Sequence, residues 1–191
     1  MNDHFQPDIV HIFGASGAGT SALGQGLSRL YGYTQLDTDD YFWMPTDPKF
    51  IEKREPAERQ KMMDADITKY QKCVITGSLC GWGDMFIPRF DLAVYIIAPK
   101  DLRLSRLKKR EYERFGSRIL PGGDMYADHI QFIEWAGNYD NGGLEMRSRA
   151  MHDAWLKQLP CPVITVDGAK PIKAILKDIG VFIPQMDQKQ K

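Results

Sequence analysis

The chain has 191 residues, which is long enough for one well-buried core. Hydrophobic residues make up 43% and charged residues 26% of it, values typical of a soluble globular protein. Its 25 basic and 25 acidic side chains balance, so no global field attracts nucleic acid or a membrane surface, and any anionic ligand must be held by a local cluster of charge.

The three cysteines, Cys73, Cys80 and Cys161, show neither metal-ligand spacing nor the even count of a disulfide framework, which predicts reduced thiols. The first residues lack an apolar signal core, and no apolar run approaches the about 18 residues that a membrane helix needs. We therefore expect a cytoplasmic protein that binds neither nucleic acid nor a membrane. The sequence gives no indication of an oligomeric state.

Apolar runs bounded by glycine, proline and polar residues predict strands that alternate with helices. The predicted strands cover residues 8–13, 34–36, 73–76, 92–98 and 162–166. The first predicted helix begins near residue 20. Five more helices are predicted over about residues 56–70, 100–115, 126–137, 144–159 and 171–179. This alternation favours a parallel sheet with right-handed crossovers in a single domain over residues 1–183, followed by a flexible polar tail over 184–191. Ligands of such sheets bind at the carboxyl ends of the strands.

The segment between the first strand and the first helix reads Gly-Ala-Ser-Gly-Ala-Gly-Thr-Ser. It matches the phosphate-binding pattern G-x-x-x-x-G-K-[ST] at every position except one, where Thr20 replaces the lysine. Glycines let successive backbone N–H groups point at phosphate oxygens, and the helix N-terminus adds positive potential. The alternative is a turn that merely tolerates small residues. The predicted nucleotide-binding residues are Gly14, Ala15, Ser16, Gly17, Ala18, Gly19, Thr20 and Ser21.

Thr20 offers one neutral hydrogen bond where a lysine would bring a positive charge to the phosphates. Backbone contacts and magnesium could still sustain nucleotide binding. Phosphoryl transfer depends more strongly on neutralisation of charge, so an active enzyme needs a substitute cation from another part of the chain.

The helix predicted over residues 100–115 carries a stripe of arginines. Arg103, Arg106, Arg110 and Arg114 fall within an arc of about 80°, beside an apolar face that we expect to pack against the sheet. The stripe suits a lid, over about residues 114–128, that closes over phosphates. We expect Arg106, Arg110 and Arg114 to neutralise transition-state charge and Arg118 to contact the nucleotide. The alternative is a solvated amphipathic helix.

Three aspartates, Asp37, Asp39 and Asp40, follow the second strand and lie next to the predicted phosphate loop. We expect Asp37 and Ser21 to position a magnesium ion, and Asp39 to orient or deprotonate the acceptor. Asp37 and Asp39 lie on one side if the strand continues through both of them. The alternative is a helix or turn cap, which suits Asp40 in particular.

An insertion over about residues 41–70 should face the acceptor. Its aromatic side chains could stack on a base, and its cations favour an anionic acceptor. These candidates are Trp43, Phe50, Lys53, Arg54 and Arg59.

Two further polar residues have structural alternatives. His11, in the middle of the first strand, is expected to be a core residue with its hydrogen bonds satisfied. Arg147 falls at the edge of an apolar helix face. Its side chain therefore either extends from the edge of the core into solvent or contacts a phosphate. Arg149 is expected at the surface.

Taken together, this order of elements resembles the nucleoside-monophosphate-kinase-like branch of P-loop kinases, which includes adenylate, shikimate and gluconate kinases. The stretch Leu36-Asp37-Thr38-Asp39 resembles the D-x-D of shikimate kinases. The stretch from Asp167 to Pro171 is similar to the loop that cups adenine, which implies that Asp167 and Gly168 contact the nucleotide. The resemblance implies a three-layer α/β/α P-loop NTPase fold with a five-stranded parallel sheet in the order 2-3-1-4-5, a lid and a small acceptor-binding insertion.

The sequence thus predicts a kinase that uses ATP and Mg²⁺ to phosphorylate a small-molecule acceptor, with a nucleotide or a similar small anion as the favoured class. The alternative is a nucleotide-binding protein that has kept the phosphate cradle and lost the chemistry, acting as a sensor or as a slow ATPase coupled to a partner.

Overall fold

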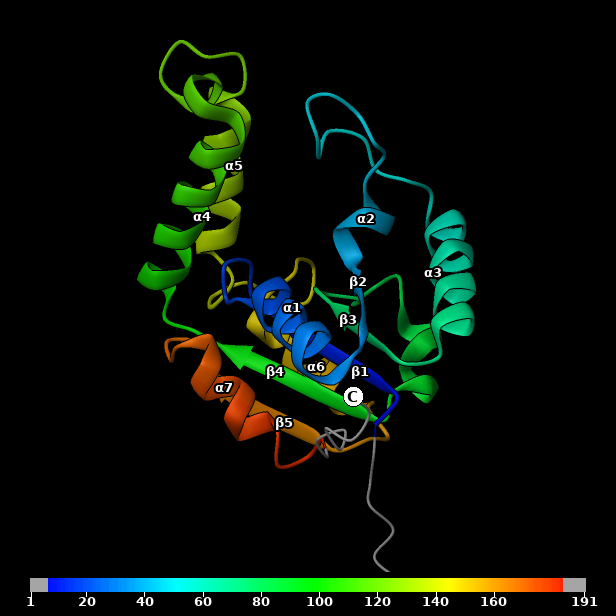
Figure 1. Cartoon of the computed structure of the whole chain (residues 1–191). Helices are drawn as coiled ribbons and strands as arrows, with labels where there is room; N and C mark the ends of the chain where they lie inside the picture. Colours follow the sequence, from blue (N-terminus) through cyan, green and yellow to red (C-terminus); the bar gives the residue numbers. More distant parts are fainter. Residues whose placement is uncertain (1–6, 184–191) are drawn as a thin grey trace, which may run out of the picture.

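Five parallel strands form one sheet in the computed structural model, which describes residues 7–183 (Figure 1). They are β1 (Ile9–Gly14), β2 (Thr34–Asp37), β3 (Cys73–Thr76), β4 (Leu92–Ile97) and β5 (Val163–Asp167). Their order is β2-β3-β1-β4-β5, with β1 paired to both β3 and β4. The predicted fold class and strand order are confirmed. The tail predicted over residues 184–191 lies outside the described residues.

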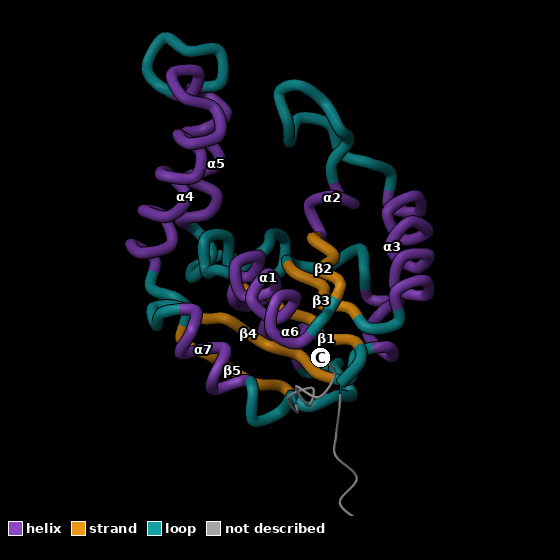
Figure 2. Tube along the Cα trace, viewed as in Figure 1, coloured by secondary structure: helices purple, strands orange, loops and turns teal. Residues whose placement is uncertain are grey.

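Helices cover both faces of the sheet and give the predicted three layers (Figure 2). On one face, α1 (Thr20–Tyr31) packs beside α7 (Ile172–Ile179). On the other face lie α3 (Pro56–Tyr70), the 3-10 helix η1 (Asp84–Arg89) and α6 (Arg149–Leu156). Each face has its own apolar cluster, and the two clusters share the central strands.

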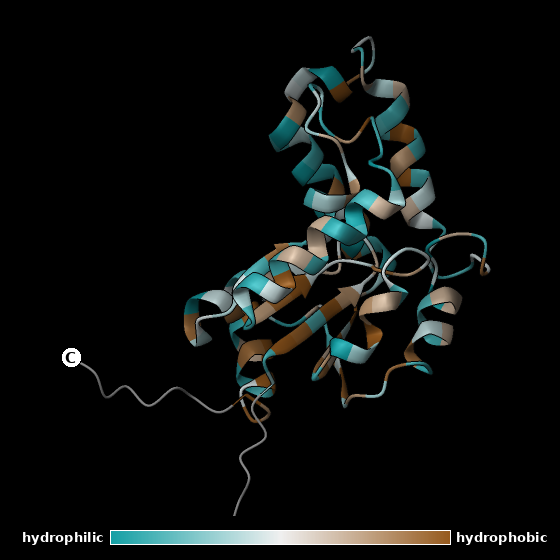
Figure 3. Ribbon diagram, turned by 90° about the vertical axis from the view of Figure 1, so that its right-hand side faces the viewer, coloured by the Kyte–Doolittle hydropathy of each residue, from teal (hydrophilic) through white to brown (hydrophobic). Residues whose placement is uncertain are grey.

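The strands carry the most apolar part of the sequence, which Figure 3 shows as brown ribbon at the centre of the molecule. Val10, Ile12 and Phe13 of β1 are fully buried, as a strand covered on both faces requires. His11 is fully buried with them, and its Nε2 lies 2.9 Å from the carbonyl oxygen of Gly77. This confirms His11 as a core residue, although its Nδ1 has no hydrogen-bond partner among the described residues.

A helical arm projects from the carboxyl edge of the sheet (Figure 1). It consists of α4 (Lys100–Phe115), the 3-10 helix η2 (Gly116–Ile119) and α5 (Tyr126–Gly137). The apolar face of α4 packs against α5 and η2 and not against the sheet, so that part of the prediction was wrong. Tyr112, for example, is 55% exposed.

The second strand ends at Asp37, so the condition under which Asp37 and Asp39 would lie on one side of it is not met. Asp37 caps the short helix α2 (Thr38–Phe42): its Oδ1 accepts a hydrogen bond from the Asp39 backbone N–H at 3.1 Å. Asp37, and not Asp40, is therefore the helix cap. The turn into α2 brings Asp39 out of the sheet and above its edge.

The last long helix is shorter than predicted because Ser148 begins it. The Ser148 hydroxyl accepts from the Met151 backbone N–H at 3.0 Å and donates to the Gly143 carbonyl at 2.6 Å. Residues 144–148 are consequently not helical, and α6 starts at Arg149. Arg147 thus lies on a loop, where the apolar helix face assumed from the sequence does not exist.

Candidate functional site

The phosphate loop runs from the end of β1 to the first turn of α1, as predicted. Gly17 and Gly19 have φ values of 81° and 111°, a conformation that favours glycine. A Cβ at Gly14 would collide with the carbonyl of Ile96, and one at Gly17 with the carbonyl of Arg103. The glycines are required by backbone conformation and close packing, which is more than the tolerance for small residues that a simple turn would show.

The loop after β5 lies beside the phosphate loop. The Gly168 N–H donates to the Ile97 carbonyl at 2.7 Å, and a Cβ on Gly168 would lie 2.8 Å from the Ala18 carbonyl oxygen. The Asp167 side chain accepts from the Ala169 N–H at 2.8 Å, which closes a turn. The predicted nucleotide residues of both segments are therefore brought together.

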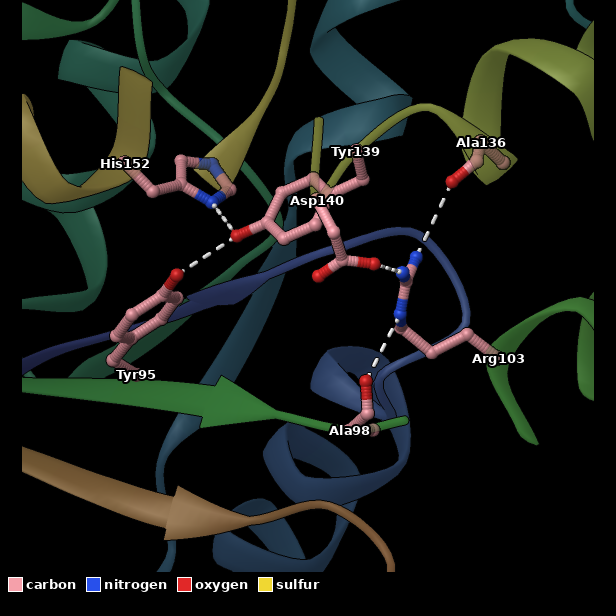
Figure 4. Close-up of polar contacts among 7 residues, drawn as sticks. All are labelled: Tyr95, Ala98, Arg103, Ala136, Tyr139, Asp140 and His152. Atoms are coloured by element: carbon pink, nitrogen blue, oxygen red, sulfur yellow. Dashed lines mark hydrogen bonds and ion pairs between the residues drawn. The ribbon is translucent and has the colours of Figure 1, made fainter. Parts of the chain in front are cut away.

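Two arginines of α4 that share the predicted stripe have different environments. Arg103 is fully buried: it donates to the carbonyls of Ala98 and Ala136 and pairs with Asp140 (Figure 4). It fixes the foot of the arm to the sheet and is not available to a ligand. Arg106 is half-buried, and its Nη1 lies 3.4 and 3.3 Å from the carbonyl oxygens of Gly17 and Ala18. Arg106 thus brings a positive charge to the phosphate loop.

Ser21 and Asp37 are brought together across α1 and β2. The Ser21 hydroxyl donates to Asp37 Oδ2 at 2.7 Å. A hydroxyl and a carboxylate are oxygen ligands of the kind that Mg²⁺ prefers, and Mg²⁺ commonly completes its shell with water and phosphate oxygens. The pair fits a magnesium ion that arrives with a nucleotide.

Asp39 is exposed to solvent at one side, and the elements around it partly desolvate its carboxyl. Desolvation raises the pKa of its carboxyl, and the nearby charge of Asp37 raises this pKa further. Arg147, Arg110 and Arg114 oppose this rise, in that order of strength. A carboxylate with a raised pKa among three cations is a candidate proton acceptor.

The arginines around Asp39 come from two segments. Arg110 is half-buried, its Nε has no partner among the described residues, and desolvation followed by repulsion from Arg114 lowers the pKa of its guanidinium. Arg114 is exposed near the tip of the arm, and its guanidinium lies 5.2 Å from the centre of the Phe50 ring. Arg147 comes from the loop before α6, with its guanidinium 5.6 Å from the Trp135 ring centre.

Arg118 is not brought to the phosphate loop. It donates to both carboxylate oxygens of Asp124, at 2.7 to 3.2 Å, and lies 3.9 Å from the Asp47 carboxylate. Hydrogen bonding to Asp124 raises the pKa of Arg118 and lowers that of Asp124. The carboxylates of the arm and of the insertion hold this side chain in the structure.

Two of the insertion's predicted cations have structural roles, which corrects the expectation that they favour an anionic acceptor. Arg54 donates to the Tyr41 carbonyl at 3.1 Å and pairs with Glu58. Arg59 is buried, donates to the Arg54 carbonyl and lies 3.9 Å over the Phe42 ring. The positive charge near Asp39 comes instead from the arm and from Arg147.

A buried polar chain that the sequence reasoning missed lies beneath this region (Figure 4). His152 Nε2 lies 3.0 Å from the Ser78 hydroxyl, and its Nδ1 lies 2.8 Å from the Tyr139 hydroxyl, which in turn lies 2.9 Å from the Tyr95 hydroxyl. Desolvation lowers the pKa of His152 to about 3. These hydrogen bonds connect α6 and the segment at Tyr139 to β4. In the sequence, Arg147 lies between Tyr139 and His152, so both ends of its loop are anchored. The only sequence signal was that His152 shares a helix face with Trp155.

Comparison with known proteins places the chain in a family. The profile of the AAA_18 family, described as an AAA domain, matches residues 10–122, which include the phosphate loop, the aspartates and most of the arm. The chain belongs to the AAA-domain family. Its predicted place in the nucleoside-monophosphate-kinase-like group of P-loop proteins is confirmed by its kinase-like relatives and its fold.

Three further matches show which proteins the chain is similar to. The protein is 47% identical over 158 residues to "Uncharacterized protein YqaC" of Bacillus subtilis (strain 168), which covers 83% of this chain and 87% of that one. It is 27% identical over 114 residues to the cytidylate kinase of Methanoregula boonei, covering 53% of this chain and 60% of that one. The solved shikimate kinase of Bacteroides thetaiotaomicron shares the fold, with a TM-score of 0.56, 17% identity and coverage of 92% and 97%.

Two negative findings concern residues 7–183. None of their helices is both long and apolar enough to cross a membrane. The same residues contain no group of three or more His, Cys, Asp or Glu side chains arranged to hold a metal ion.

Proposed function

We propose that this AAA-domain protein is a kinase that uses Mg²⁺ and ATP to phosphorylate a small anionic acceptor, with a nucleotide as the favoured class. The observation that carries the proposal is the placement of Asp39, which follows β2 beside Asp37 and lies among Arg110, Arg114 and Arg147. A carboxylate that accepts a hydroxyl proton, with cations that neutralise the transferred charge, meets the requirements of phosphoryl transfer.

In this proposal the loop from Gly14 to Ser21 binds the phosphates, and Asp167 and Gly168 contact the rest of the nucleotide. Ser21 and Asp37 hold Mg²⁺, which supplies neutralisation of the phosphate charge when bound. Arg118 would reach the nucleotide only by leaving Asp124. The domain covers residues 1–183, with an acceptor-binding insertion at about 41–70 and a lid at about 114–128, and acts in the cytoplasm without nucleic acid or a membrane.

Arg106 is our first candidate for the charge that Thr20 does not supply. Its guanidinium already contacts the phosphate loop through the carbonyls of Gly17 and Ala18. A guanidinium that turns from these carbonyls toward a bound phosphate would exchange long hydrogen bonds for charge-assisted ones. Arg110 and Arg114 would then neutralise charge on the acceptor side.

The test is a coupled assay of ADP formation with MgATP and a panel of acceptors. CMP comes first because of the cytidylate kinase relative, followed by AMP, UMP, shikimate and gluconate. We expect transfer to at least one acceptor, and its loss in Asp39→Asn with MgATP binding retained. Binding of MgATP without transfer to any acceptor would contradict the proposal.

That contrary result would favour the second candidate, a nucleotide-binding protein without efficient chemistry, for which Thr20 is the specific observation. Thr20→Lys separates the two. If the arm arginines already supply the charge, restoring the lysine changes transfer little. A large gain would show that they do not supply it.

A further inference from the structure

Two contacts join the insertion to the helical arm, although the two segments are far apart in the sequence. The Arg114 guanidinium lies 5.2 Å from the centre of the Phe50 ring. The Asp47 carboxylate lies 3.9 Å from Arg118. Asp47 and Phe50 belong to the loop over residues 43–55 between α2 and α3, called here the acceptor loop, and both arginines belong to the arm (Figure 1).

The two contacts are unequal. Asp47 is almost fully exposed and the ion pair is long, so this contact adds little stability. A guanidinium over an aromatic ring gains from the ring quadrupole, and it restricts a long side chain that would otherwise sample many rotamers. The Phe50–Arg114 contact is therefore the one that can set the position of the arginine.

The backbone conformation of Phe50 and neighbouring aromatic side chains hold its ring in place. Its φ is +71°, a value that a bulky side chain adopts only when its surroundings hold it there. The edge of Trp43 meets its ring at 6.1 Å between centroids, and Trp43 packs on Phe42 at 4.9 Å. Arg59, buried on α3, lies over Phe42. A continuous stack thus leads from α3, past the helix that carries Asp39, to the arm.

We propose that Phe50 is a positioning residue whose ring aligns the Arg114 guanidinium toward the reaction site next to Asp39. The inference rests on the proposed function, in which Arg114 neutralises transferred charge. Because the ring is delivered by the acceptor loop, the arginine is aligned only when that loop is in place. An acceptor that holds this loop in place would thereby favour transfer over hydrolysis of ATP.

The first measurement is independent of activity. In ¹⁵N-labelled protein, the ring current of Phe50 should shift the Arg114 Nε–Hε resonance, which an Arg114→Lys spectrum assigns. Phe50→Leu should remove this shift, and Phe50→Tyr should retain it. Phe50→Asn, which tolerates the positive φ but has no ring, separates the effect of the ring from that of the backbone. An unchanged resonance in Phe50→Leu would overturn the inference.

The second measurement follows transfer from MgATP to CMP. If CMP is not a substrate, it uses the acceptor that the panel identifies. Phe50→Leu should lower kcat about ten-fold and change the KM for MgATP less than about two-fold, while Phe50→Tyr restores kcat. Hydrolysis relative to transfer should rise in Phe50→Leu. The double variant Phe50→Leu, Arg114→Met should be no slower than Arg114→Met alone, because both changes remove the same contact.

The matched control is Asp47→Asn, which removes the exposed ion pair of the same loop and should change kcat by less than about two-fold. Equal losses in Phe50→Leu and Phe50→Tyr, or additive losses in the double variant, would reduce Phe50 to a packing residue. If the wild type transfers to no acceptor, the proposed function fails, and the Arg114 resonance alone then decides whether Phe50 holds that side chain.

Discussion

The part of the site around the phosphate loop and the part around Asp39 are built from the chain in different ways. The first is formed largely by backbone atoms of eight consecutive residues, with the turn at Gly168 beside them. The second is formed by side chains from α2, the acceptor loop, the arm and the loop before α6. We call them the nucleotide half and the acceptor half.

The difference shows how each half can change. A backbone cradle fails only if its conformation changes, so substitutions near it act through glycine geometry. A cluster of side chains on separate segments depends on each segment's own anchors, such as the Arg103–Asp140 pair at the foot of the arm. We therefore expect substitutions in the acceptor half to alter transfer while nucleotide binding survives.

Asp39→Asn should give the largest difference between the effect on phosphoryl transfer and the effect on nucleotide binding. Removing the proton acceptor should lower transfer about 1,000-fold while the affinity for MgATP changes less than about three-fold. Single-turnover transfer and calorimetric MgATP binding measure the two effects. Asp40→Asn, one residue away and exposed, is the control and should stay near wild type in both. A parallel loss of binding would show that Asp39 belongs to the nucleotide half.

Acid should first weaken the packing of α6, which follows Arg147 of the acceptor half, against β1, because two buried histidines lie there. Burial lowers the pKa of His11 to about 4 and that of His152 to about 3, from 6.5. The unfolded chain takes up these protons below pH 6.5 and the folded chain does not, so the stabilisation is complete above pH 6.5 and is lost as the pH falls toward 4 and 3. Each histidine should cost about 2 kcal/mol of unfolding free energy between pH 7 and pH 5.

Urea unfolding at pH 7, 6 and 5 tests the summed loss of about 4 kcal/mol. His152→Gln should halve the pH dependence, and hydrogen exchange at pH 5 should increase in α6 before it increases in α1. Stability that stays constant from pH 7 to pH 5 would rule out this explanation.

Arg106 tests whether the division between the halves is complete, since it rises from the arm and contacts the phosphate loop. Arg106→Met should lower transfer about 100-fold, because a charge near the phosphates is removed from a site without a lysine. Adding Thr20→Lys to that variant should recover much of the loss. Lys108→Met, exposed on the same helix, is the control. If Arg106→Met transfers phosphate at the wild-type rate, Arg110 and Arg114 would be the residues that supply the missing positive charge.

The smallest effect is expected at Arg118, whose carboxylate partners Asp124 and Asp47 are exposed. Arg118→Ala should leave the midpoint of thermal unfolding close to that of the wild type and transfer within about two-fold of wild type. Thermal unfolding and the coupled assay measure these values. A large loss of transfer would show that the side chain leaves Asp124 when the nucleotide binds.

The nucleotide half could be predicted from the sequence because its information is local. A strand, a glycine pattern and a helix follow one another in it. Elements outside this half that also have local signals, β3, α3 and α4, were predicted with the extents that the structure has. The strand order came from family resemblance, since no local signal specifies which strands are neighbours in a parallel sheet.

The acceptor half was predicted only in part, because its geometry depends on contacts between remote segments. Periodicity placed Arg103 and Arg106 on one face of α4, but it could not show that Asp140 binds one and the phosphate loop the other. The charges of Arg54 and Arg59 suggested ligand binding, yet backbone carbonyls and aromatic rings use them. The Ser148 cap, which places Arg147 on a loop, is a local signal, because serine is a favoured N-cap residue.

The close approach of Gly17 to the Arg103 carbonyl has a mechanical consequence. The foot of α4 rests on the phosphate loop, so a shift of that loop on nucleotide binding acts on one end of a lever. With 16 residues, α4 is about 24 Å long, and a rotation of about 10° at its foot would displace its tip by about 4 Å. A sub-ångström adjustment around the phosphates would thus be amplified into a motion large enough to move Arg114 on or off the ring of Phe50.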